Sequence, residues 1–344
     1  MFDFTHLDLN LIWFILIGVL FSGYAMLDGF DLGIGALHLL TRTDSERRLM
    51  INSIGPVWDG NEVWLVTGGG ALFAAFPDVY ATLASGFYFA VMLLLLSLIF
   101  RAVAIEFRSK HPSPAWRQFW DVSFSVSSIL ASLVLGIALG NLVRGVPLGA
   151  DKEFAGTFWG LFNPYAVLVG ITTVALFMMH GSIYAVLKTE GEFHAKVRGW
   201  VNNCIIFFII CYAATTMVTL VYMPHMVDKF RDHPVFFAIP LLNMLTIANI
   251  PREIHHGRAF MAIVSSCAAM LALIALVGIG IHPNIVASDP GPEHSLTIYN
   301  AASSIRALNY MLNIAVLGIP FVLAYTIGIY WIFRGKVRLT KDSY

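Results

Sequence analysis

Charged side chains are scarce in this sequence. Only 12% of its 344 residues are Asp, Glu, Lys or Arg, whereas 58% are hydrophobic and the mean hydropathy is +0.75. A soluble globular domain carries roughly 25% charged residues, so half that share cannot cover a water-facing surface of this length. We therefore expect lipid to surround most of the chain. Lys and Arg equal Asp and Glu at 21 each, so no basic excess indicates a nucleic-acid partner.

Cysteine and the common catalytic motifs are also sparse. The sequence contains no Cys-x-x-Cys pair and no Cys-x-x-Cys-His haem-attachment motif. The cysteines lie inside apolar runs and are interpreted as small buried residues: Cys204, Cys211 and Cys267. A P-loop, a Rossmann glycine fingerprint and a nucleophile elbow are missing, which leaves nucleotide-driven and hydrolase functions without support. His38 and the His255-His256 pair lack metal-ligand spacing, so no metal site is expected.

Long apolar runs fill most of the chain. Crossing the hydrocarbon core of a bilayer takes about 20 mostly apolar residues, and runs of that length predict an all-α polytopic transmembrane bundle of about nine helices. The expected spans are 9–40, 50–76, 79–107, 116–143, 163–187, 199–222, 234–250, 259–281 and 307–333. The first run has no basic region before it and no cleavage site, so we expect a retained helix. Residues 1–344 are expected to form one membrane domain.

The cationic residues are distributed unevenly over the short loops between these spans. Most Lys and Arg residues fall on the cytoplasmic side when the N-terminus is placed outside, as the positive-inside rule requires. The bias would collapse if one span were missed or invented in the first half of the chain. The sequence therefore predicts an outer N-terminus and a cytoplasmic C-terminus.

Four acidic residues lie where the expected spans cross the hydrocarbon. Asp28 and Asp31 are on the first span, Asp59 and Glu62 are on the second, and each pair has the i,i+3 spacing that places side chains on one helix face. At 1.5 Å per residue from the cytoplasmic charges, both pairs lie near the middle of a core about 30 Å thick. An ionised side chain at that depth costs several kcal/mol unless it is protonated, paired or wetted.

We expect no Lys or Arg at membrane depth that could neutralise these acids. Carboxyl groups without cationic partners in apolar surroundings favour their protonated form, which suits a proton relay. We therefore expect a proton pathway or an ion site, with Asn61 close to the acids. The alternative is that the carboxylates bond to Asn61, Ser, Thr or Trp N–H groups and only hold the helices together.

Three further polar residues are candidates. Glu106 lies between two arginines at the cytoplasmic end of the third span, where it is either an interfacial ion-pair member or the mouth of a proton path. Asp121 is expected to form an i,i+4 ion pair with Arg117. His180 follows two methionines in the fifth span. Because no second histidine lies at a compatible depth, we expect a hydrogen-bonded structural or relay role for His180 and not haem ligation.

Several strings of the sequence are shared with one family. They are Asp28-Gly-Phe-Asp-Leu-Gly-Ile-Gly35, Glu46-Arg-Arg48, Asn52-Ser-Ile-Gly-Pro-Val-Trp-Asp-Gly-Asn-Glu-Val-Trp64, Gly69-Gly-Ala-Leu-Phe-Ala-Ala75, Arg101 to Arg108 with Ser109 and Lys110, and Gly140-Asn-Leu142 with Gly145-Val-Pro147. With them the chain resembles subunit II of the cytochrome bd-type quinol oxidases, a family that includes the cyanide-insensitive oxidases. The match is strong over about residues 1–200 and looser but collinear beyond.

The resemblance implies a nine-helix subunit of the bacterial cytoplasmic membrane that pairs with a haem-bearing subunit I. That partner would carry the b-type and d-type haems, oxidise quinol near the outer face and reduce O2 to water. No catalytic residue, cofactor ligand or metal ligand is then expected in this chain. A structural quinone in this subunit and small single-helix accessory subunits are also compatible with the family, and no residue is assigned to either.

The resemblance also implies a proton path through this subunit, with acids at the positions of Asp59 and Asp28. We expect protons to enter from the cytoplasm at Glu106 and to cross to the haems of the partner. The residues expected between are Asp59, Asn61, Glu62, Asp28 and Asp31. Two rival hypotheses are a stand-alone proton-coupled transporter, for which we find no repeated halves, and a purely structural subunit.

Overall fold

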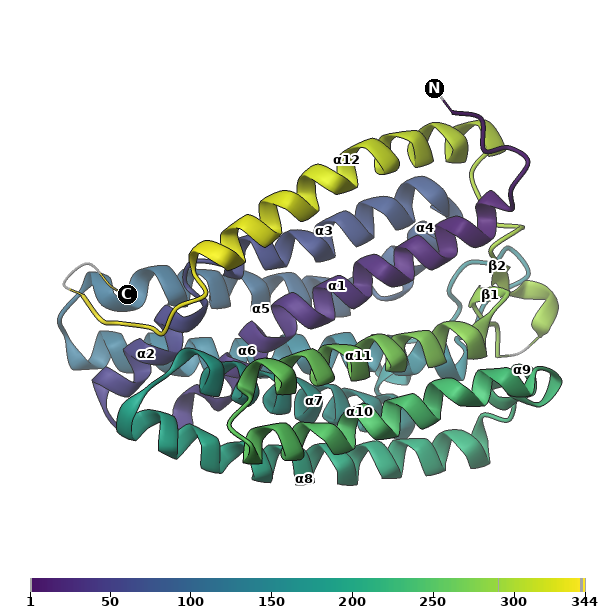
Figure 1. Ribbon diagram of the computed structural model, residues 1–344. Coiled ribbons are helices and arrows are strands. Elements are labelled where there is room, and N and C mark those ends of the chain that lie inside the picture. Colours follow the sequence, from purple (N-terminus) through teal and green to yellow (C-terminus); the bar gives the residue numbers. More distant parts are fainter. Residues whose placement is uncertain (1, 290, 341–342, 344) are drawn as a thin grey trace.

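The computed structural model describes residues 2–289, 291–340 and 343. Within them every long element is a helix, and the only sheet is the short antiparallel pair β1 (Asn284–Val286) and β2 (Leu296–Thr297). Helices satisfy all backbone polar groups within their own segment, which is what a hydrocarbon environment requires. The long helices run side by side, with α2 and the C-terminus at one end of the bundle and β1, β2 and the N-terminus at the other (Figure 1).

Eight helices of the described residues are long and apolar enough to cross a membrane. These spans are formed by α1 (Leu9–Leu37), α5 (Tyr88–Phe107), α6 (Pro114–Arg144), α7 (Pro164–Lys188), α8 (Gly191–Tyr222), α10 (Ala238–His255), α11 (Ala259–Ile281) and α12 (Ile305–Ile332). The remaining α-helices are α2 (Asp44–Ile54), α3 (Trp58–Ala75), α4 (Pro77–Gly86) and α9 (His225–Asp232). The chain is therefore an all-α polytopic membrane protein.

Two of the expected spans are each divided in the structure. Residues 50–76 include the end of α2, a break at Gly55 and Pro56, and α3, because a proline has no N–H to continue the helical hydrogen bonds. Residues 79–107 are divided at Phe87 between α4 and α5. The first turns of α3 contain Asp59 and Glu62, which explains why this helix is less apolar than the eight spans although it packs along α1.

α1 runs through the middle of the bundle, in contact with α3, α6, α7 and α11 (Figure 1). Its closest approach is to α7, where a β-carbon added at Gly33 would overlap the carbonyl oxygen of Phe177, and one added at Gly181 would lie 2.5 Å from the carbonyl carbon of Gly33. Small residues allow helix backbones to approach this closely in lipid. This contact fixes the depth and rotation of the α1 segment that carries Asp28 and Asp31.

We expect Gly33→Ala to destabilise the protein by about 1–3 kcal/mol, because the added methyl group forces α1 and α7 apart. The matched control is Gly18→Ala in the same helix, since a β-carbon there has no neighbour within 4 Å. The measurement is the thermal unfolding of both purified variants. Equal stability of the two variants would show that the α1–α7 contact can relax.

Candidate functional site

Arg101 lies at the centre of a buried polar cluster between α1, α3 and α5. Its Nη1 donates a hydrogen bond of 2.7 Å to Asp28 Oδ1, and its Nη2 lies 3.2 Å from Glu62 Oε2. The side chains of Arg101 and Asp28 are fully buried, whereas that of Glu62 is 20% exposed. Pairing removes much of the cost of placing either charge away from water.

The expectation that no cation lies within the spans is therefore wrong. The count of loop charges assigned Arg101 to the cytoplasmic side, but its position is inside α5, six residues before that helix ends at Phe107. The long side chain extends across to Asp28 on α1 and does not turn toward the end of the helix. The sequence feature that could have placed Arg101 inside the span is the apolar run that continues for four residues after it.

Asp31 belongs to a second chain of contacts in the same region. Asn61 Nδ2 donates to Asp31 Oδ2 at 2.8 Å and to the Leu27 carbonyl oxygen at 3.1 Å, and the Tyr330 hydroxyl donates to Asn61 Oδ1 at 2.7 Å. Asp31 is fully buried. Within the described residues it forms no ion pair, and its Oδ1 accepts no hydrogen bond. Asp28 Oδ2 likewise has no hydrogen-bond partner among the described residues.

Two of the expected pathway residues lie outside this group. Asp59 is exposed on the outer side of α3, and Glu106 is half-buried on α5. Neither makes a hydrogen bond or an ion pair with another described residue. We use the name Arg101 cluster for the residues that the structure brings together: Asp28, Asp31, Asn61, Glu62 and Arg101. Sequence analysis missed Arg101 and the Tyr330 hydroxyl.

The expected ion pair between Asp121 and Arg117 is also wrong. Asp121 is fully buried and accepts from Arg108 Nε at 2.6 Å and from Arg47 Nη1 at 2.7 Å, while His38 Nε2 lies 2.6 Å from its Oδ1. Arg117 instead lies 3.3 Å from Asp44. The reason is that Asp121 points into the bundle, where the guanidinium groups of Arg47 and Arg108 and the ring of His38 reach it. Arg117 remains partly exposed one turn away.

His180 is fully buried, and both of its ring nitrogens have partners. Nδ1 lies 2.8 Å from Ser266 Oγ, and Nε2 lies 2.9 Å from the Met26 carbonyl oxygen. These contacts tie α7 to α11 and α1. Because neither nitrogen is open to a metal, the ring does not fit the position of a haem ligand, and no haem chemistry is assigned to it. No group of three His, Cys, Asp or Glu side chains in the described residues could hold a metal ion.

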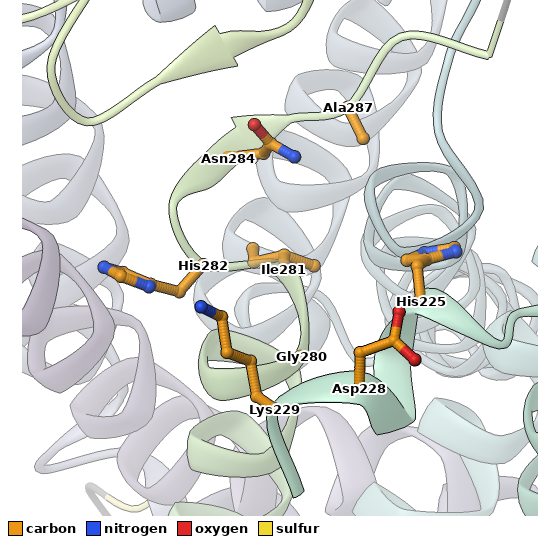
Figure 2. A pocket seen from close by; sticks show the side chains of 8 residues that line it. All are labelled: His225, Asp228, Lys229, Gly280, Ile281, His282, Asn284 and Ala287. Carbon is orange, nitrogen blue, oxygen red and sulfur yellow. The ribbon is translucent and has the colours of Figure 1, made fainter. Parts of the chain in front are cut away.

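A cavity of about 190 Å³ lies at the end of the bundle that carries β1 (Figure 2). His225 and His282 lie on opposite sides of it, with Asp228 near the first ring and Lys229 near the second (Figure 2). His225 Nε2 is 2.9 Å from the Val143 carbonyl oxygen. Burial lowers the pKa of His282, and the charge of Lys229 lowers it further. None of the expected site residues lines this cavity.

Three comparisons identify the family. The family described as cytochrome bd terminal oxidase subunit II matches residues 9–333. Cytochrome bd-I ubiquinol oxidase subunit 2 of Escherichia coli K12 is 36% identical, with 97% of this chain and 96% of the relative covered. Cytochrome bd ubiquinol oxidase subunit 2 of Bacillus subtilis is 34% identical, with 96% and 97% covered.

A solved structure supports the same conclusion for the fold. The bd oxidase from Geobacillus thermodenitrificans contains a chain that superposes with a TM-score of 0.79 at 15% sequence identity, covering 95% of this chain and 99% of that one. The resemblance found in the sequence motifs is therefore confirmed. The chain belongs to the family of cytochrome bd terminal oxidase subunit II.

Proposed function

We propose that this subunit conducts protons from the cytoplasm toward oxygen-reducing haems that are carried by its partner, subunit I. As a member of its family, the chain is a component of a terminal quinol oxidase in the bacterial inner membrane, and haems and a subunit I belong to that complex. Quinol would release its protons on the outer side, so consuming cytoplasmic protons at the haems would separate charge across the membrane without a pump.

The observation that carries this proposal is the group of acids inside the Arg101 cluster. The group holds three carboxyl groups and one guanidinium, which pairs with Asp28 and Glu62 and leaves Asp31 without an ion pair in the described residues. Ionisable residues inside a membrane protein are costly and usually mark a pathway or a binding site. Asp31, whose Oδ1 has no partner in the described residues, is suited to accept and pass on a proton.

Asp59 supports a pathway that leads out of this subunit. It is the polar member of an exposed stripe on α3 that continues through Val63, Val66, Gly70 and Phe73 at helical spacing. A carboxylate facing lipid at this depth would be costly, so we propose that subunit I covers the stripe. Asp59 would then lie between the two subunits, one turn from Glu62, where a proton can cross from one to the other.

The expected entry at Glu106 remains part of the proposal. Glu106 is half-buried near the end of α5 that leads to Arg108, and it has no partner in the described residues. With the C-terminus in the cytoplasm, as the distribution of Lys and Arg indicates, this end of α5 faces the cytoplasm. An unpaired carboxylate there can collect protons and release them inward.

A purely structural role has one specific observation in its favour, the buried ion pair of Arg101 and Asp28. That pair joins α5 to α1 and would hold the helices together whether or not protons pass. Asp59 separates the two hypotheses, because it makes no hydrogen bond or ion pair with another described residue.

We expect Asp59→Asn to lower quinol-driven O2 consumption at least tenfold while the haem content per complex is unchanged, since an amide keeps the shape of the carboxyl group but cannot carry the proton. Both quantities are measured on the purified complex. The control is Asp78→Asn, which alters an exposed carboxylate in the first turn of α4 and should leave turnover unchanged. Normal turnover of an intact Asp59→Asn complex would favour the structural hypothesis.

A further inference from the structure

A second cavity, of about 300 Å³, is lined in part by the segment that follows α12. That segment runs at the same end of the bundle as α2 (Figure 1). The walls of the cavity come from the break between α2 and α3, from the end of α7 and from the segment after α12. The cationic lining residues are Lys188, Lys336 and Arg338, and the described lining contains no acidic residue. The cavity is unrelated to the Arg101 cluster, none of whose members lines it.

The segment after α12 is fastened in place over this cavity. The backbone N–H of Val337 donates to the Lys188 carbonyl oxygen at 2.9 Å, and Lys188 Nζ donates to the carbonyl oxygen of Phe333. Lys336 Nζ donates to the carbonyl oxygens of Leu187 and Val186 at 2.9 and 3.3 Å. These contacts give the cavity a defined wall.

The positive charges of this wall are not neutralised by carboxylates in the described residues. The partners of Lys188 and Lys336 are all neutral carbonyl groups, and Arg338 is exposed without a hydrogen bond to that part of the chain. The N-terminus of α3 also borders the cavity, through Pro56 and Val57, and its positive end is partly offset by Asp59 in the first turn of the helix. Such a site favours an anion, with phosphate as the chemistry that suits both helix N-termini and Lys or Arg groups.

The surroundings of the cavity favour a lipid as the source of that phosphate. Ile332 and Phe333 line it and are exposed at the end of the membrane-spanning α12, and the next residue, Arg334, stacks over the exposed Trp331 with 4.1 Å from the guanidinium carbon to the ring centroid. Tryptophan and arginine at the end of a span are typical of the level of the lipid headgroups. Basic pockets between membrane helices on the cytoplasmic side bind anionic headgroups.

We propose that this cavity binds the phosphate headgroup of an anionic phospholipid, whose acyl chains then follow the exposed apolar side chains at the end of α12. The volume suits a headgroup with its glycerol and leaves the acyl chains outside. The lipid would join the ends of α3, α7 and α12, so that it acts as part of the cytoplasmic wall of the subunit.

The test is a native mass spectrometry titration of the purified oxidase complex with phosphatidylglycerol and with phosphatidylcholine of the same acyl chains. We expect one phosphatidylglycerol to bind more tightly than any phosphatidylcholine. The variant Lys336→Gln/Arg338→Gln should weaken that binding about 30-fold, since each cation near an anionic headgroup contributes about fivefold. Arg338→Gln alone should weaken the binding about fivefold. Because it removes no hydrogen bond within the described residues, its effect cannot come from the lost contacts of Lys336.

The control is Arg42→Gln/Lys110→Gln, which removes two exposed cations from other loops at the same end of the bundle. Unchanged binding in this control, with loss in the cavity variants, supports the proposal. Equal loss in control and cavity variants, or no loss in either, would overturn it. Displacement of phosphatidylglycerol by inorganic phosphate at equal concentration would also overturn it, because the site would then recognise a free anion and not a lipid.

Discussion

Replacing Arg101 with methionine is expected to destabilise the subunit by about 3–5 kcal/mol and to lower the yield of assembled oxidase. Methionine retains an unbranched apolar stem but leaves Asp28 and Glu62 close together without a cation. Removing one partner of a fully buried ion pair is costly because the remaining charge stays uncompensated. The measurement is thermal unfolding of the purified complex, with haem content as a check on assembly.

The double variant Arg101→Met/Asp28→Asn is the matched control for this prediction. It removes both members of the pair, and replacing a whole buried ion pair by uncharged residues is often close to neutral. We therefore expect most of the lost stability to return. If the double variant is as unstable as Arg101→Met, the guanidinium stabilises the bundle through Glu62 or through packing, and the contact with Asp28 contributes little.

The double variant also tests which role Asp28 plays. An intact double variant with slow O2 consumption would show that turnover needs the Arg101–Asp28 pair and not only the stability that the pair provides. An intact double variant with normal turnover would restrict the pathway to Asp31, Glu62 and Asp59. Stability and turnover are thus separated in one protein, which neither single substitution achieves.

The acids of the cluster could be predicted from the sequence, whereas their cation could not. Asp28 and Asp31 stand out because a carboxylate in the middle of an apolar run has few explanations. Arg101 lies near the end of such a run, and an arginine there can extend toward the headgroups or fold back into the bundle. Only the rotation of α5 against α1 decides between these directions, and that rotation depends on the packing of the whole bundle.

The separation of Asp59 from Glu62 has a similar geometric origin. Residues at i,i+3 are neighbours on a helix surface, but three steps of a 3.6-residue helix leave them about 60° apart around the axis. In α3 this angle places Glu62 on the side that packs against the bundle, where it contacts Arg101, and Asp59 on the exposed side. Spacing alone places both acids on one face and cannot locate that border.

Asp121→Asn is expected to cost about 3–5 kcal/mol of stability. The carboxylate is fully buried and is the shared acceptor of Arg47 and Arg108, with His38 at 2.6 Å. Asparagine preserves the shape but leaves two guanidinium groups without their common anion, one of them only 1% exposed. The control is Asp44→Asn, which also contacts Arg108 but has a side chain 46% exposed, so its loss should cost no more than about 1 kcal/mol.

Turnover gives this last prediction a second readout. The residues around Asp121 lie on α2 and α6 and on the short 3-10 turns that follow α1 and α5, near the end of the bundle. None of them forms a hydrogen bond or ion pair with a member of the Arg101 cluster in the described residues. A complex that assembles with Asp121→Asn should therefore consume O2 at a nearly normal rate per haem although it unfolds at a lower temperature. A large loss of turnover in a stable, fully haem-loaded Asp121→Asn complex would instead place the buried ion network of Asp121 on the proton route, in place of an entry through Glu106.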